Sequence, residues 1–205
     1  MRAKFISLVI IFQLLSLNES FPTNFKCNES KQSAEYVSDV RNYVNEMSEY
    51  FNTRSTPNLD LSTIGLGFLR DDELSSSNGI SYRHILSLNL SLNVLKFISF
   101  GLILQYPNLQ DLDLSRNCLT SLEVKYRLIF QNLSTLNVSR NFILHIHPFV
   151  FSNLSLEVVD LSHNHLIRFL AADFSLNRLH INDNKLTHLE IDSGHHKELQ
   201  LLDAS

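Results

Sequence analysis

Glycine, proline and cysteine are all scarce in this chain of 205 residues, and tryptophan is absent. Five glycines and four prolines disfavour a sandwich of many short strands, because such a fold needs turn residues at frequent intervals. The motifs GxSxG, GxxxxGK(S/T) and HExxH do not occur, and five glycines could not supply most glycine-rich catalytic loops. We therefore expect a protein that is not an enzyme and needs no cofactor.

A strong charge of either sign is also lacking. The formal net charge is −4, and 44% of the residues are hydrophobic. This small charge gives no reason to expect a nucleic-acid partner or an anionic membrane surface. The apolar fraction is sufficient for a buried core. Beyond the N-terminal segment no apolar run approaches about 18 residues, so we expect no membrane span in the mature chain.

The N-terminus carries a long apolar run over residues 5–17, behind the positive charges of Arg2 and Lys4. The run is shorter than the roughly 20 residues that a membrane-spanning helix needs, and it is typical of a secretory signal. We predict a signal peptide over residues 1–20, with cleavage after Ser20 or, alternatively, after Ser16. The competing interpretation is a buried N-terminal core helix. A signal peptide predicts a secreted, extracellular protein.

If the chain is secreted, its N-glycosylation sequons, of the form N-x-S/T, can receive glycans. A further match at Asn18 lies in the cleavage region, and some matches arise by chance because serine and asparagine are abundant. We expect two or three sites to be used. The candidates are Asn28, Asn89, Asn132, Asn137 and Asn153.

The two cysteines, Cys27 and Cys118, are too few for a disulfide framework or a CxxC metal site. They could form a disulfide with each other if the N-terminal segment folds back onto the rest of the chain. They could also bond to another chain or stay free, and the sequence leaves these alternatives open.

A pattern of apolar residues and one asparagine, LxxLxLxxNxL, recurs through the second half of the chain. In LQDLDLSRNCL it begins at Leu109, and its asparagine is Asn117. The period of about 24 residues is that of a repeat array. The predicted repeats span residues 85–108, 109–132, 133–155, 156–175 and 176–198, with a partial repeat at 199–205.

The spacing within the pattern predicts one short strand per repeat, at positions 3 to 5, with positions 4 and 6 pointing inward. Stacked repeats would then place their strands side by side, about 4.8 Å apart, as a parallel sheet. The asparagine at position 9 falls where the chain turns off the strand, and its amide can satisfy backbone groups inside the coil. The predicted interior ladder comprises Asn93, Asn117, Asn141, Asn164 and Asn184.

These repeats resemble the leucine-rich repeat family, in particular the "typical" extracellular subclass found in Toll-like receptor ectodomains and secreted proteins. The resemblance implies an α/β-type repeat solenoid, right-handed and curved, with the parallel sheet on its concave side. The chain departs from the family because it has no cysteine-rich caps and stops in mid-repeat at Ser205. We expect a fragment of a longer product or an end covered by a partner, such as a dimer through the open C-terminal end.

Residues 21–84 form a predicted N-terminal flanking and capping region. Within it, a helix is expected at about 33–52, because apolar residues such as Tyr36, Val40 and Tyr43 recur at helical spacing. This helix is interpreted as a cap over the first repeat, with a dimerisation or partner helix as the alternative. Residues 52–60 and 70–79 are predicted loops, and LSTIGLGFL between them is a predicted irregular capping strand.

The family resemblance implies that the concave face binds a ligand. Glycans on Asn89 and Asn137 would obstruct that face and move the ligand to a flank. The competing interpretation is that the polar positions there are simply solvated. The candidate ligand-facing residues are Asp113, Arg116, Arg140, Asp160, His163 and His180.

Two HxH pairs, His145 with His147 and His163 with His165, are candidate metal ligands, since alternate residues on a strand share a face. They lie at turns or beyond the strands, and no cysteine or carboxylate set completes them. We interpret them as exposed, variable positions and predict no metal site.

The sequence thus predicts a secreted, non-catalytic recognition module of the adhesion, signalling or innate-immune type. Its partner would be a protein, or a microbial or glycan ligand, held by the concave or lateral face. The alternative is the N-terminal fragment of a membrane receptor ectodomain, with further repeats and a membrane span beyond this chain.

Overall fold

The computed structural model describes residues 27, 57–69, 82–99, 105–122, 132–147, 150–151, 155–171, 175–191 and 201–203. The predicted signal peptide, the helix at 33–52 and the loop at 70–79 lie outside the described residues, and so do Asn28 and Asn153.

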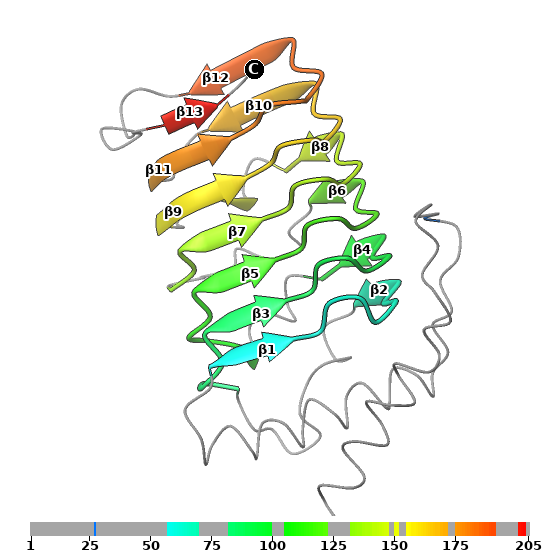
Figure 1. Cartoon of the computed structure of the whole chain (residues 1–205). Coiled ribbons are helices and arrows are strands. Elements are labelled where there is room, and N and C mark those ends of the chain that lie inside the picture. The colour runs from blue at the N-terminus through cyan, green and yellow to red at the C-terminus, as the bar shows by residue number, and fades with distance from the viewer. Residues whose placement is uncertain are drawn as a thin grey trace, which may run out of the picture.

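A parallel sheet of seven strands runs the length of the described structure, with its strands in chain order (Figure 1). Each strand pairs with the next one along the chain. This arrangement confirms the predicted parallel-strand repeat solenoid, whereas its right-handedness remains a prediction. The strands are β1 (Asn58–Asp60), β3 (Ser87–Asn89), β5 (Asp111–Asp113), β7 (Thr135–Asn137), β9 (Ser155–Asp160), β11 (Ser175–His180) and β13 (Leu201–Asp203).

Six further strands follow the strands of this long sheet and form a second column beside it (Figure 1). They pair in parallel as three separate two-stranded sheets, so this side of each coil is less continuous than the long sheet. The pairs are β2 (Phe68–Leu69) with β4 (Phe97–Ile98), β6 (Ser121–Leu122) with β8 (His145–Ile146), and β10 (Arg168–Ala171) with β12 (His188–Ile191).

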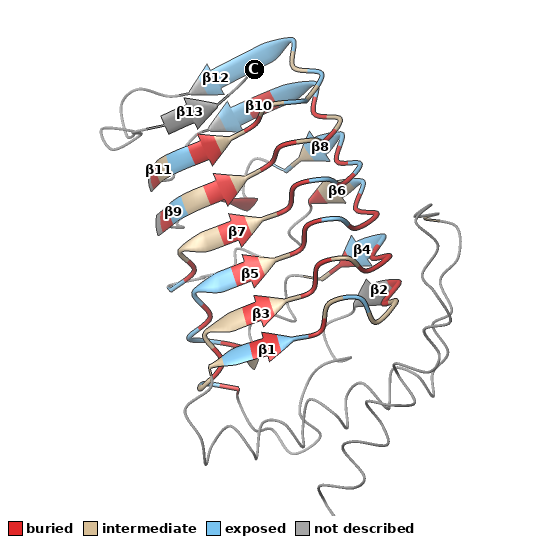
Figure 2. Ribbon diagram, in the orientation of Figure 1, coloured by how far each residue is buried: buried red, intermediate tan, exposed pale blue. Residues whose placement is uncertain are grey.

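The register of the long sheet places the apolar residue at position 4 of every coil in one row. Leu88 pairs with Leu112, and Leu112 pairs with Leu136. These residues are buried, while their strand neighbours face outward (Figure 2). One coil cannot bury such a row alone, so stacking its neighbours supplies the core.

One coil begins earlier than the sequence predicted. Asn58–Asp60 forms β1 and pairs with β3, so the predicted loop over 52–60 is wrong for these three residues. Leu59, Leu61 and Leu66 are buried in the same way as their counterparts in later coils. The coil escaped detection because Ile64 stands where the pattern has asparagine.

The ladder asparagines each hold two coils together. Asn117 donates through Nδ2 to the carbonyls of Leu114 in its own coil and Leu90 in the preceding coil, both at 3.0 Å. Its Oδ1 accepts the backbone N–H of Leu95, also at 3.0 Å. The same set of bonds recurs at Asn93, Asn141, Asn164 and Asn184.

A disulfide joins Cys27 to Cys118, two residues separated by 91 positions in the sequence. Of the alternatives that the sequence left open, the structure therefore has the intramolecular pair. The bond fixes one point of the N-terminal flank against the coil that contains β5.

Candidate ligand-binding face

The candidate residues fall into two rows on the exposed side of the long sheet, which we call the sheet face. Asp113, Asp160 and His180 end their strands. Arg116, Arg140 and His163 lie three residues further along, in the turns that follow β5, β7 and β9. The structure thus brings together residues that are 20 or more positions apart in sequence, because successive coils present equivalent positions side by side.

Two residues of the first row, Asp113 and Asp160, stabilise the backbone. The Asp113 carboxylate accepts the backbone N–H of Ser115 at 2.8 Å, and Asp160 accepts that of Ser162 at 2.9 Å. These contacts are Asx turns, which direct the chain off the strand. The same contact occurs at Asp60, Asn89 and Asn137. The sequence interpretation of this row as ligand-facing therefore missed a role in the backbone.

The second row lies on strained backbone. Arg116 and Arg140 both have φ of 55°, and His163 has φ of 54°, in the left-handed region that residues other than glycine seldom adopt. The backbone N–H of Arg116 bonds to Ser139 O in the next coil at 2.9 Å, and Arg140 bonds likewise to Ser162 O. These bonds between coils hold the turn, and the two arginines are exposed.

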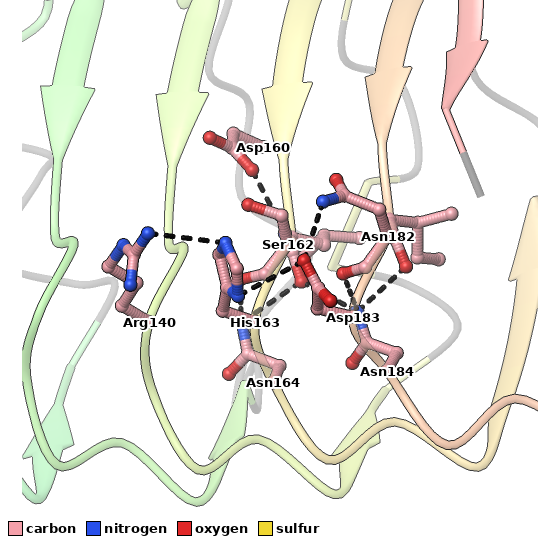
Figure 3. Close-up of polar contacts among 10 residues, drawn as sticks. Arg140, Asp160, Ser162, His163, Asn164, Asn182, Asp183 and Asn184 are labelled. Carbon is pink, nitrogen blue, oxygen red and sulfur yellow. Dashed lines mark hydrogen bonds and ion pairs between the residues drawn. The ribbon is translucent and has the colours of Figure 1, made fainter. Parts of the chain in front are cut away.

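Three charged or titratable side chains in the second row contact one another across three coils (Figure 3). Arg140 Nη2 lies 3.3 Å from His163 Nε2, and His163 Nδ1 lies 3.2 Å from Asp183 Oδ2. A guanidinium can only donate, so a hydrogen bond from Arg140 requires Nε2 of His163 to accept, which leaves Nδ1 to donate to the Asp183 carboxylate. Asp183 was not among the predicted site residues, although it occupies the same repeat position.

The HxH pairs do not converge on a metal. His163 points to Asp183, whereas the His165 ring packs edge-on against Phe142, with centroids 5.6 Å apart. Among the described residues, no group of three histidine, cysteine, aspartate or glutamate side chains could hold a metal ion.

A shallow hollow lies away from the sheet face, beside β8 and β10. Its volume of about 90 Å³ is well below the roughly 300 Å³ at which small-molecule sites begin. His145, His147 and Arg168 contribute to its wall together with apolar side chains. This hollow is therefore too small to enclose an ordinary small-molecule substrate.

The shifted pKa values among the described residues fall outside the strands of the long sheet. Burial raises the pKa of the Tyr106 phenol, and the neighbouring Tyr82 raises it further. The two rings stack with centroids 5.0 Å apart. Burial lowers the pKa of His84. Both shifts are therefore caused first by burial of the side chain within the packed coils.

The described sequon asparagines differ in how their amides are used. In Asn89 and Asn137 the Oδ1 oxygen accepts the hydrogen bond of an Asx turn. A glycan would attach to the other amide atom, Nδ2. Asn132 is exposed and donates from Nδ2 to Pro107 O at 2.9 Å. A glycosylated amide keeps one N–H, so this bond is compatible with modification.

Comparison with protein families gives a match for residues 132–154 to the model described as Leucine Rich Repeat. The matched stretch contains β7, Asn141 and β8, that is, most of one coil. Among curated proteins, no match is found. Within the described residues, no helix has the length and apolar character to cross a membrane.

Proposed function

Because this chain is a leucine-rich repeat protein, we propose that it is a secreted, non-catalytic recognition module that binds a protein ligand on its sheet face. Repeats of this family typically serve as binding scaffolds. A solenoid of short coils offers a broad surface, and such surfaces suit protein partners. The family resemblance predicts that the sheet face is the concave side.

Three features support an extracellular location. The apolar run at residues 5–17 behind Arg2 and Lys4 is typical of a secretory signal. The exposed sequon at Asn132 would be available to the secretory pathway. The disulfide between Cys27 and Cys118 suits an oxidising compartment, since such bonds are rare in the cytosol.

The observation that carries the binding proposal is the pair of exposed arginines at Arg116 and Arg140. Their turns hold them at equivalent positions on consecutive coils, and β5 of the same sheet carries the acidic residues Asp111 and Asp113. Arginine is enriched at the energetic centres of protein interfaces because its planar head makes several directed hydrogen bonds. A surface with both signs of charge in fixed rows can select a partner with the complementary pattern.

The test is a binding screen of the secreted full chain against an array of purified extracellular proteins. Replacing both arginines by glutamine, Arg116→Gln with Arg140→Gln, should weaken capture of a genuine partner about tenfold or more. Lys185→Gln, an exposed cation off the sheet face, is the matched control and should leave capture unchanged. Equal capture by both variants would move the ligand to another face.

The secretory part of the proposal has its own test. Expression in a secreting eukaryotic host should yield protein whose mass falls on treatment with a peptide-N-glycosidase. Asn132→Gln should remove one glycan, since Asn132 is an exposed sequon residue that lies before β7. Protein retained in the cytosol without glycans would contradict secretion.

A further inference from the structure

The contacts between Arg140, His163 and Asp183 on the sheet face include one group that changes its charge near neutral pH, the imidazole of His163. Arg140 Nη2 lies 3.3 Å from Nε2 of this ring, and Asp183 Oδ2 lies 3.2 Å from Nδ1 (Figure 3). The ring therefore lies between a permanent cation and an anion, with one nitrogen toward each. Uptake of a proton by the ring changes both contacts, in opposite directions.

The contact on the Asp183 side persists when the ring is protonated. Asn182 Nδ2 donates to the same carboxylate oxygen at 2.9 Å, which helps to orient the oxygen that His163 contacts. The backbone N–H of His163 also bonds to Asn182 O at 3.0 Å, so the two coils are joined at this point. A protonated ring still donates from Nδ1, and its positive charge makes the bond to the carboxylate stronger. His163 therefore keeps Asp183 in both charge states.

The contact on the Arg140 side depends on a neutral ring. A guanidinium has donors only, and Nε2 of a protonated imidazole is a donor as well. Protonation thus removes the acceptor and leaves two cations 3.3 Å apart. Arg140 is exposed, and within the described part of the chain its guanidinium has no second polar partner to hold it. The side chain is therefore free to move into solvent.

The remaining ionisable groups near the ring stand on the strands that precede these turns. They are Glu157 and Asp160 on β9, and Arg178 and His180 on β11, while β7 carries none. Oδ1 of Asp160 accepts a backbone N–H of its own turn at 2.9 Å. In the residues that the structure describes, no ion pair joins any of these groups to His163. The charge of the ring is therefore governed chiefly by its two direct partners.

We propose that His163 is a proton-operated switch of the sheet face: when its ring takes up a proton, it keeps Asp183 and releases Arg140. The released guanidinium presents all of its donors to a partner, and the face gains one positive charge. Carboxylates of a partner protein should therefore be bound more tightly at about pH 5–6 than at neutral pH. This consequence rests on the proposed recognition role of the sheet face, whereas the release of Arg140 is a property of the free protein.

The first test is NMR of the free, folded full chain, labelled with 15N, from about pH 8 to about pH 5. At the upper end, the ring nitrogens of His163 should show the tautomer with its proton on Nδ1, because Nε2 accepts from Arg140. The side-chain N–H signals of Arg140 should then shift over the pH range in which the His163 ring titrates. The opposite tautomer, or Arg140 signals that ignore this titration, would overturn the proposal.

Two variants isolate the switch. His163→Gln keeps a neutral acceptor for Arg140 but cannot take up a proton, so the Arg140 signals should become insensitive to pH. The backbone should tolerate this change, because arginine has the same left-handed conformation in the two preceding coils. His165→Gln is the matched control, since the His165 ring packs against Phe142; it should leave the wild-type response intact. A response that persists in His163→Gln would assign it to another group and refute the switch.

The consequence for binding is measured with the same array of purified extracellular proteins, screened at about pH 7.5 and about pH 5.5. Wild-type capture that depends on Arg140 should rise about twofold to fivefold at the lower pH, the effect of one exposed ion pair. His163→Gln should show no such rise, and an equal rise in both proteins would overturn the link to the switch. A screen that captures nothing would contradict the recognition role, while the NMR result would still decide whether Arg140 is released.

Discussion

At the scale of single residues, the asparagine at position 9 is the most demanding choice in each coil. Asn117 makes four hydrogen bonds, three as donor and one as acceptor, and is 2% exposed. Its partners belong to two coils, so one side chain closes a turn and binds the preceding coil at the same time. An apolar residue of similar size could fill the space but would leave backbone groups of both coils unpaired.

Replacing Asn117 by leucine should therefore lower the free energy of unfolding by about 3 kcal/mol or more, since each unsatisfied buried group costs roughly 1–3 kcal/mol. Asn177→Leu is the matched control, because Asn177 is half-buried on β11 and outside the ladder. That variant should stay within about 0.5 kcal/mol of the wild type. Urea unfolding measures both values, and equal losses would contradict the ladder register.

Tyr106 presents the opposite case, a buried hydroxyl that has no hydrogen-bond partner among the described residues. Tyr106→Phe removes that uncompensated group and keeps the stacking on Tyr82, so its melting temperature should equal or exceed that of the wild type. Tyr106→Ala is the contrasting variant, and it should lose about 3–5 kcal/mol through the cavity. A loss of more than about 1 kcal/mol in Tyr106→Phe would show that the hydroxyl is bonded.

The same tyrosine gives a pH dependence. Burial holds the pKa of Tyr106 above its ordinary value of 10.0, so the folded phenol keeps its proton when the unfolded one ionises. The contribution of this proton to stability is fully present below pH 10 and decreases as the pH rises further. Unfolding free energies measured between pH 9 and about pH 11 should fall less steeply in Tyr106→Phe than in the wild type, and parallel slopes would contradict this.

At the scale of elements, five strands of the long sheet end in the same turn motif. An Asx turn follows β1, β3, β5, β7 and β9, and a residue with positive φ comes three positions later. The Asx turn redirects the backbone. The residue with positive φ then lets the ladder asparagine enter the interior. In the coil of β11, His180 takes the place of the aspartate or asparagine.

Substitutions in this turn can separate the structural role of Asp113 from its binding role. Asp113→Asn should leave stability unchanged within about 0.5 kcal/mol, since Asn89 and Asn137 make the same contact. Asp113→Ala should lose about 1 kcal/mol with the hydrogen bond. Asp111→Ala, an exposed neighbour on β5, controls for charge alone. Thermal unfolding of the three variants decides, and a loss in Asp113→Asn equal to that in Asp113→Ala would refute the turn's role.

At the scale of the whole molecule, every coil bonds mainly to its neighbours, so stability accumulates along the stack. The disulfide is an exception, because it links residues separated by 91 positions. It constrains the unfolded chain over a long loop and ties the N-terminal flank to the repeats. That connection matters for a solenoid whose first coil, with Ile64 at position 9, has no ladder asparagine of its own.

Loss of this disulfide should be costly. Cys27→Ser combined with Cys118→Ser is expected to lower the free energy of unfolding by about 2–5 kcal/mol. Urea titrations with and without reductant provide the check, since reductant should destabilise the wild type to a similar extent and leave the double variant unaffected. A wild type that is indifferent to reductant would indicate that the bond contributes nothing to stability.

The sequence by itself determined the stacked coils and their common register, because a single coil with period-2 leucines and one interior asparagine can bury its apolar edge only against copies of itself. It did not reveal β1, because Ile64 removes the marker by which a coil is recognised, and it left the pairing of Cys27 open. The chain of Arg140, His163 and Asp183 was likewise decided by tertiary structure. These side chains meet because left-handed turns on successive coils set them a few ångströms apart, and no local pattern encodes the spacing between coils.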